Sequence, residues 1–234
     1  MRNYEGIFKE MNAVIHFSCS GQSKAVAEDL AKRLDYDLYE TRSVEGKIFE
    51  NVAIVFPVHC QSYPKPLKSF FKALNAKHVT LIATYGRAHC GNAIYEAAKL
   101  ITGEIVAAAY LPAKHTYCES GETVFVPEEI VCKMRAPLPI KIPKLKKTPF
   151  AGFLPDLRSR LIIKIKKSKK CVSCGICGGQ CPVGAIKNGN ISTKCIRCLK
   201  CVSSCPQGAL TVKQGSILRR YLRKPRYEKT LIYT

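Results

Sequence analysis

Eight cysteines lie in two short runs that repeat one spacing. In each run three cysteines stand three residues apart, a fourth follows after a gap of three residues, and a proline comes next: Cys171, Cys174, Cys177, Cys181 and Pro182, then Cys195, Cys198, Cys201, Cys205 and Pro206. This CxxCxxCxxxCP run is the one that holds pairs of [4Fe-4S] clusters. The sequence therefore predicts two [4Fe-4S] clusters bound by eight thiolates.

The spacing also predicts which thiolates share a cluster. Three thiolates on one tight loop reach three corners of a cubane, while the fourth, displaced by the longer gap and the proline turn, points away and serves the other cluster. The expected ligand sets are Cys171, Cys174, Cys177 and Cys205 for the first cluster, and Cys195, Cys198, Cys201 and Cys181 for the second. The two clusters must then be close neighbours.

A zinc ribbon and a disulfide framework are the competing interpretations of these cysteines. A zinc ribbon uses two CxxC pairs separated by roughly 15 to 20 residues, which is not the pattern seen here. Gly175, Gly178 and Gly179 leave the first loop free to wrap closely around a cluster. After each run, residues 182–186 and 206–210 read Pro-x-Gly-Ala followed by Ile or Leu, which predicts a helical turn. Residues 171–210 resemble a bacterial two-cluster ferredoxin, with all eight ligands and both prolines present.

The chain of 234 residues leaves room for a second domain, because the ferredoxin-like repeat with its flanks needs only about 60 residues. No apolar run precedes Ala13 and none approaches the roughly 18 residues of a membrane span, so we expect neither a signal peptide nor a transmembrane segment. A cytoplasmic location is expected, where thiols stay reduced. The remaining cysteines are then free thiols: Cys19, Cys60, Cys90, Cys118 and Cys132.

The formal net charge is +21. Each cluster with its four thiolates contributes roughly −2 when oxidised, so the loaded protein remains strongly basic. This charge favours redox partner proteins with acidic docking surfaces. We expect no nucleic-acid binding, because no helix-turn-helix pattern is present and the charge has a simpler use in cluster screening and protein docking.

The first strand-length apolar run, residues 13–17, leads directly into the loop Ser18, Cys19, Ser20, Gly21, Gln22 and Ser23 and then into a helical pattern from Lys24 to Leu34. Hydroxyl and backbone N–H groups of such a loop converge on one phosphate at the positive end of a helix. The G-x-G-x-x-G of a dinucleotide site and the Gly-Lys-Ser of a P-loop are both missing. The loop resembles the phosphate loop of flavodoxins, with serine in place of threonine; an ordinary serine cap is the alternative.

Two further loops each follow an apolar strand, at residues 52–56 and 78–85, and precede a helix. In a parallel sheet they would lie beside the phosphate loop, at the carboxyl ends of adjacent strands. The flavodoxin resemblance implies that they hold the isoalloxazine ring of FMN. The residues expected there are Pro57, Val58, His59, Cys60 and Tyr63 in the second loop, and Thr84, Tyr85, Gly86, Arg87, His89, Cys90 and Gly91 in the third. Packing or solvation remains the alternative role for the individual histidines and tyrosines.

Further strands are expected at residues 37–41 and 104–111, and a helix from about Gly91 to Leu100. The alternation of strand and helix predicts an α/β fold, a doubly wound flavodoxin-like parallel sheet of order 2-1-3-4-5, followed by a small α+β two-cluster ferredoxin domain. The expected domains are 1–135 for FMN, 136–165 as a basic connector, 166–214 for the clusters and 215–234 as a basic tail. Prolines at 137, 139 and 143 should cut the last helix of the first domain short.

The connector carries eleven Lys or Arg against one Asp between Lys141 and Lys170. We expect extended chain first and then a basic amphipathic helix within LRSRLIIKIKK, packed against the flavin domain; contact with a membrane surface is the alternative. The C-terminal tail either returns to a domain or stays mobile.

The whole chain resembles the fused flavodoxin-ferredoxin proteins of anaerobic bacteria. The resemblance implies electron transfer between two [4Fe-4S] clusters and an FMN and on to a partner redox enzyme. The alternative is an FMN-dependent reductase of a small molecule, with His59, His89 or Tyr117 as proton donor. No acidic residue occurs between Pro57 and Ala93, so positive neighbours are expected to favour the reduced flavin and make it the downhill end of the path.

Overall fold

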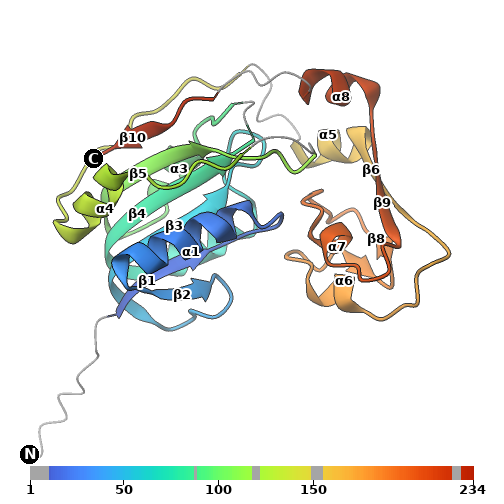
Figure 1. The fold of residues 1–234 in the computed structure, drawn as a ribbon, viewed down its shortest axis with the longest axis horizontal. Coiled ribbons are helices and arrows are strands. Elements are labelled where there is room, and N and C mark those ends of the chain that lie inside the picture. The colour runs from blue at the N-terminus through green and yellow to red at the C-terminus, as the bar shows by residue number, and fades with distance from the viewer. Residues whose placement is uncertain (1–10, 87–88, 118–121, 149–154, 223–227) are drawn as a thin grey trace, which may run out of the picture.

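A computed structural model describes residues 11–86, 89–117, 122–148, 155–222 and 228–234. An α/β part and a smaller part that carries the cysteine runs lie side by side (Figure 1). The α/β part contains β1 (Met11–His16), α1 (Gln22–Leu34), β2 (Asp37–Glu40), β3 (Ile48–Pro57), α2 (Leu67–Ala73), β4 (Asn75–Tyr85), α3 (Ala93–Ala98), β5 (Glu104–Pro112), α4 (Glu128–Arg135) and β10 (Leu231–Tyr233). The smaller part contains α5 (Pro155–Ile162), β6 (Ile163–Lys167), α6 (Ile176–Gly179), β7 (Ile186–Lys187), β8 (Asn190–Ile191), α7 (Lys200–Ser203), β9 (Leu210–Gln214) and α8 (Ser216–Leu222).

The larger sheet has the strand order β10-β5-β4-β3-β1-β2. Its first five strands pair in parallel, with Val14 opposite Ala53 and Thr80 opposite Ala107. The predicted flavodoxin-like order 2-1-3-4-5 is therefore confirmed. All the loops that follow these strands leave from one edge of the sheet, and in Figure 1 that edge faces the smaller part.

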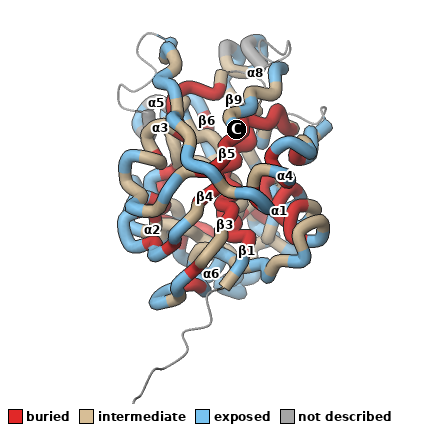
Figure 2. Tube along the Cα trace, turned by 90° about the vertical axis from the view of Figure 1, so that its left-hand side faces the viewer, coloured by how far each residue is buried: buried red, intermediate tan, exposed pale blue. Residues whose placement is uncertain are grey.

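The central strands β1, β3, β4 and β5 have continuous buried runs, as is usual for a parallel sheet (Figure 2). On one face α1 and α4 pack Leu30 and Ile130 against Val14. On the other face α2 and α3 pack Phe71 and Ile94 against the neighbouring strand residues. Successive strand side chains point to opposite faces, so the continuous apolar runs of the sequence supply two cores at once.

Helix α4 ends at Arg135, ahead of the prolines, as predicted. The chain then runs extended along the α/β part. The amide of Ile140 donates to the Ile105 carbonyl at 2.7 Å, and the amide of Leu145 donates to Asn92 Oδ1 at 2.6 Å. Ile142 and Leu145 pack against the core. The first half of the predicted connector is thus a strap across the sheet edge and α3.

The predicted amphipathic helix of the connector is wrong in its second half. Helix α5 ends at Ile162, and β6 follows and pairs with β9 in antiparallel register, Ile163 opposite Gln214. The physical reason is the alternation of residues 163–167: Ile163 is buried, while Lys164 and Lys166 are exposed, which is the two-residue period of a strand. Among the described side chains of this helix, Leu157 and Leu161 are 46% and 68% exposed, so these two leucines do not pack against the sheet part as predicted.

The predicted helical turns after the cysteine runs are also corrected. Gly184 and Gly208 have φ values of 58° and 54°, which ends each turn in the left-handed region that favours glycine. The chain then enters β7 after the first turn and β9 after the second. Each turn directs an amide at a thiol: Ala185 donates to Cys181 Sγ at 3.2 Å and Ala209 to Cys205 Sγ at 3.3 Å.

The C-terminal tail returns to the α/β part, one of the two alternatives that the sequence left open. Strand β10 pairs antiparallel with β5, Ile232 opposite Ala109. The Tyr85 hydroxyl donates to the Lys229 carbonyl at 2.5 Å, fixing the approach to this strand. No helix within the described residues has the length and apolar character needed to span a membrane.

Candidate functional site

The first predicted ligand set converges on one cavity. Cys171, Cys174, Cys177 and Cys205 all line it, although Cys205 lies in the other run. Leu210, at the start of β9, closes its inner side. Residues Ser173 and Gly175 have φ values of 56° and 78°, so the loop curls tightly around the cavity. The arrangement matches a crossed set of four thiolates, and the ligand roles themselves remain a prediction.

The second run repeats the local backbone of the first. Arg197 and Leu199 have φ values of 58° and 62°, at the positions that correspond to Ser173 and Gly175. Cys195 and Cys201 are buried, and Cys198 is partly buried. Among the described residues, no group of three or more His, Cys, Asp or Glu side chains is arranged to hold a single metal ion.

The predicted phosphate loop lies at the amino end of α1. Gly21 has a φ of 91°, its amide donates to Ser18 Oγ at 3.1 Å, and no side chain caps the helix. Ser20 and Gly21 are exposed, and no acidic residue occupies the first turn. The positive end of α1 is therefore accessible to an anion. Ser23 differs from the expectation, because its buried hydroxyl is hydrogen-bonded to Thr84 Oγ1 at 2.8 Å.

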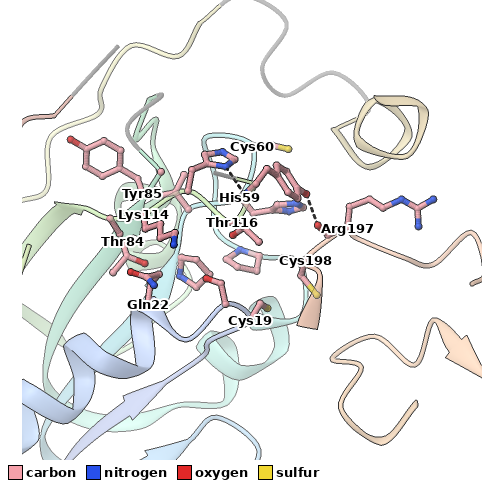
Figure 3. A pocket seen from close by; sticks show the side chains of 18 of the residues that line it. Cys19, Gln22, His59, Cys60, Thr84, Tyr85, Lys114, Thr116, Arg197 and Cys198 are labelled. Atoms are coloured by element: carbon pink, nitrogen blue, oxygen red, sulfur yellow. Dashed lines mark hydrogen bonds between the residues drawn. The ribbon is translucent and has the colours of Figure 1, made fainter. Parts of the chain in front are cut away.

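A cavity of about 290 Å³ adjoins this loop at the carboxyl ends of the strands (Figure 3). Eleven of the predicted loop residues line it: Cys19, Ser20, Gln22, Pro57, Val58, His59, Cys60, Thr84, Tyr85, Gly86 and His89. The second and third loops are joined, because the Asn92 amide donates to the Gln61 carbonyl at 3.0 Å. The structure thus brings the three predicted loops together around one space.

Several side chains of the second and third loops, which were expected to hold the flavin ring, point away from the cavity or lie outside the described residues. Tyr63 packs edge-on against Phe71, with ring centroids 5.4 Å apart. The Tyr85 ring extends away from the cavity in Figure 3, toward its partner Lys229. Cys90 is buried in the core next to Gly91, and burial raises the pKa of its thiol. Arg87 lies outside the described residues, as does Cys118.

A fourth loop lines the cavity, and the sequence predicted a role only for its Tyr117. Residues 113–117, which follow β5, line the same cavity with Lys114, His115 and Thr116. His115 packs over Gly86, where an added Cβ would lie 2.2 Å from the imidazole ring. The Tyr117 amide donates to His115 Nδ1 at 3.2 Å, so the neutral ring carries its proton on Nε2. The signal was available in the sequence: this loop follows the fifth parallel strand as the others follow theirs.

The wall opposite these loops comes from the second cysteine run. Ile196, Arg197 and Cys198 line the cavity. The Tyr117 hydroxyl donates to the Arg197 carbonyl at 2.5 Å, and the Arg197 guanidinium turns away from the cavity and donates through Nε to the Ile163 carbonyl at 3.0 Å (Figure 3). Cys19 and Cys198 lie close together at the border of this cavity. Burial raises the pKa of the Tyr117 hydroxyl, which keeps it a hydrogen-bond donor.

His115 makes the stability of this site dependent on pH. Burial lowers the pKa of His115 to about 4, whereas the unfolded chain has the ordinary value of 6.5. The unfolded state therefore binds more protons between these values, and the free energy of unfolding falls as the pH is lowered from about 6.5 to about 4. We expect His115→Phe to flatten this dependence in urea unfolding at about pH 7 and pH 5. An unchanged pH slope in the variant would contradict the assignment to His115.

Comparison with known proteins identifies one family in the smaller part. Residues 165–187 and 191–211 match the Fer4 family, the 4Fe-4S binding domain. The two matched segments contain all eight cysteines of the runs. None of the curated proteins matches the chain.

Three solved structures illustrate similarity to the remainder. A putative flavoprotein from Bacteroides uniformis ATCC 8492 is 16% identical, with a TM-score of 0.37, over 46% of this chain and 93% of that one. A flavodoxin from the domain Archaea is 16% identical, with a TM-score of 0.38, over 53% and 91%. A putative flavoprotein from Bacteroides eggerthii DSM 20697 is 16% identical, with a TM-score of 0.34, over 55% and 98%. By its own strand order and its family match, the chain joins a sheet of flavodoxin-like order to a 4Fe-4S binding domain.

Proposed function

We propose that the protein passes electrons between two [4Fe-4S] clusters and an FMN and on to a partner redox enzyme. A 4Fe-4S binding domain supports an electron-transfer role in general. The observation that carries the finer proposal is the shared cavity: residues 196–198 of the second cysteine run form one wall, and the loops of the flavodoxin-like sheet form the others. A thiolate expected on iron therefore lies at the edge of the space expected to hold the flavin.

The donor set of the sheet edge fits a flavin mononucleotide. The exposed amino end of α1, with its uncapped amides and the hydroxyls of Ser18 and Ser20, suits one phosphate group. The adjoining cavity has no acidic lining residue, Lys114 lies on its border, and Gly86 leaves room there for His115. The sequence lacks the second and third glycines that a dinucleotide needs, so a mononucleotide is proposed.

The two cysteine runs fit two clusters. The thiols of the first predicted ligand set come from both runs and line one cavity. The amides of Ala185 and Ala209 donate to the two cysteines that cross to the other cluster, Cys181 and Cys205. Amide donors of this kind stabilise thiolate charge and fix the orientation of the sulfur. When bound, the clusters supply one-electron chemistry and the flavin supplies the conversion between one-electron and two-electron transfer.

The protein contributes the contact between these two parts. Tyr117 donates to the Arg197 carbonyl, Arg42 donates to the Cys181 carbonyl at 3.2 Å, and Lys200 pairs with Glu40 at 3.1 Å. All three interactions join the sheet part to the second cysteine run or to its crossing ligand. They fix the position of the second run relative to the loops of the sheet part. Tyr117 is committed to this contact, which argues against its use as a proton donor to a substrate.

The proposal predicts about eight iron atoms and one FMN per chain after anaerobic purification. Iron, sulfide and flavin assays with a visible spectrum measure this directly. In a reductive titration of the loaded protein, both sets of absorbance bands should bleach, since the shared wall gives electrons a path between them. Substoichiometric zinc without visible absorbance, or tightly bound FAD in place of FMN, would contradict the proposal.

A further inference from the structure

The two cysteine runs have the same local backbone but opposite surroundings. They are offset by 24 residues, from Cys171 to Cys195, so Val172 corresponds to Ile196 and Cys174 to Cys198. Ile196 is 3% exposed because it packs into the wall of the flavin cavity, whereas Val172 is 66% exposed. Cys174 is exposed, whereas Cys198 is partly buried. The second run thus faces the sheet part, and the corresponding atoms of the first run face solvent.

The exposed run presents an apolar centre. Val172 and Ile176 are 66% and 44% exposed, and both line the cavity of the first predicted ligand set. An apolar group left in water directly over a redox site costs free energy that burial against a partner would recover. An apolar centre with a polar rim is the usual composition of a protein docking patch.

Positive charge surrounds this centre. The Lys167 chain passes the cavity, since a Cβ on Gly189 would lie 2.4 Å from Lys167 Cδ and 3.4 Å from Cys171 Sγ. Four further exposed lysines flank the run in sequence or in the adjoining strands: Lys166, Lys169, Lys170 and Lys187. No Asp or Glu occurs between Asp156 and Glu228. The patch therefore complements an acidic surface and repels a basic one.

We propose that this patch, defined by Val172, Cys174 and Ile176 with the surrounding lysines, is the docking surface for an acidic one-electron carrier protein. The proposal rests on the proposed function and adds to it the route by which electrons enter. The carrier exchanges electrons with the cluster of the exposed run, and the cluster of the second run connects that cluster to the flavin. The two halves of the repeat therefore have different tasks, one external and one internal.

The electron balance is simple. Each encounter oxidises one reduced carrier by one electron and reduces the exposed cluster by one electron. Full reduction of one flavin consumes two electrons, hence two carrier molecules, and takes up its proton from solvent. An acidic [2Fe-2S] ferredoxin of the plant type is a suitable probe, because ferredoxins of this type are low-potential one-electron donors.

The test compares two exposed apolar residues changed to glutamate. Val172→Glu adds a negative charge within the patch. Leu138→Glu adds the same charge at a residue of similar exposure, 63%, in the strap on the sheet part. The dissociation constant of the oxidised plant-type ferredoxin is measured by calorimetry at low and high salt, and the rate of cluster reduction by the reduced ferredoxin is measured by stopped flow. Iron and FMN contents and reduction by dithionite are measured on every variant.

We expect Val172→Glu to weaken binding and slow reduction by the ferredoxin about tenfold at low salt, and Leu138→Glu to change either by less than about twofold. Excess dithionite, a small reagent that needs no docking surface, should still reduce the clusters of both variants completely. Equal effects of the two substitutions would show that only net charge matters and would overturn the proposal, as would unchanged ferredoxin binding in Val172→Glu. Failure of the proposed function would be visible separately, as absent iron or FMN in the unsubstituted protein.

Discussion

Replacing Cys181 with serine is expected to lower the iron content from about eight to about four atoms per chain, with loss of the cluster on Cys195, Cys198 and Cys201. The reason is the crossing of the fourth ligand. Cys181 is the last cysteine of the first run, and the spacing predicts that it serves the second cluster. Its carbonyl accepts a hydrogen bond from Arg42 of the sheet part, and its thiol accepts one from the Ala185 amide. The mirror substitution, Cys205→Ser, should remove the cluster on Cys171, Cys174 and Cys177.

Alkylation followed by mass spectrometry distinguishes the two losses. In Cys181→Ser, Cys195, Cys198 and Cys201 should become reactive, while Cys171, Cys174, Cys177 and Cys205 should stay protected. In Cys205→Ser, Cys171, Cys174 and Cys177 should become reactive, while Cys195, Cys198, Cys201 and Cys181 should stay protected. Cys132→Ser is the matched control, because Cys132 is exposed on α4 and lies outside both runs, so iron should remain near eight. Exposure of the first run in Cys181→Ser would show that each run binds its own cluster.

Replacing Gly91 with alanine is expected to destabilise the sheet part by about 2–5 kcal/mol and to release the flavin. Gly91 has a φ of 61°, which costs an alanine about 1–2 kcal/mol. An added Cβ would also lie 2.3 Å from the backbone oxygen of Gln61, and overpacking of that kind adds about 1–3 kcal/mol. Since this contact joins the second and third loops, the clash acts directly on the cavity.

Gly46→Ala separates the two contributions. Gly46 has a similar φ of 75°, but nothing lies within 4 Å of the position of an added Cβ, so it reports backbone strain alone. The two free energies of unfolding are measured in urea, and FMN retention is measured after gel filtration. Equal destabilisation of the two variants, with flavin retained in both, would mean that the loops move apart without cost.

Much of the chemistry and the fold was predictable because it depends on local spacing. The spacing within the CxxCxxCxxxCP runs is enough to predict the two thiol sets, and the first set lines one cavity as expected. The strand order 2-1-3-4-5 followed from the alternation of apolar strands with helices, since short parallel connections restrict the topology. Errors arose where two local patterns competed: in LRSRLIIKIKK the last five residues alternate as a strand does, and pairing with β9 decided the outcome.

The sequence by itself was enough to predict the thiol sets, the sheet and the loops at its edge. Only the tertiary structure decided which half of the repeat faces the cavity at the sheet edge. Val172 and Ile196 occupy equivalent positions on equivalent backbones, so no local property distinguishes them; the difference is long-range contact, in which Tyr117 and Cys19 meet the second run and leave the first in solvent. The tail was undecided for the same reason, because β10 exists only where the edge of β5 offers unpaired backbone groups.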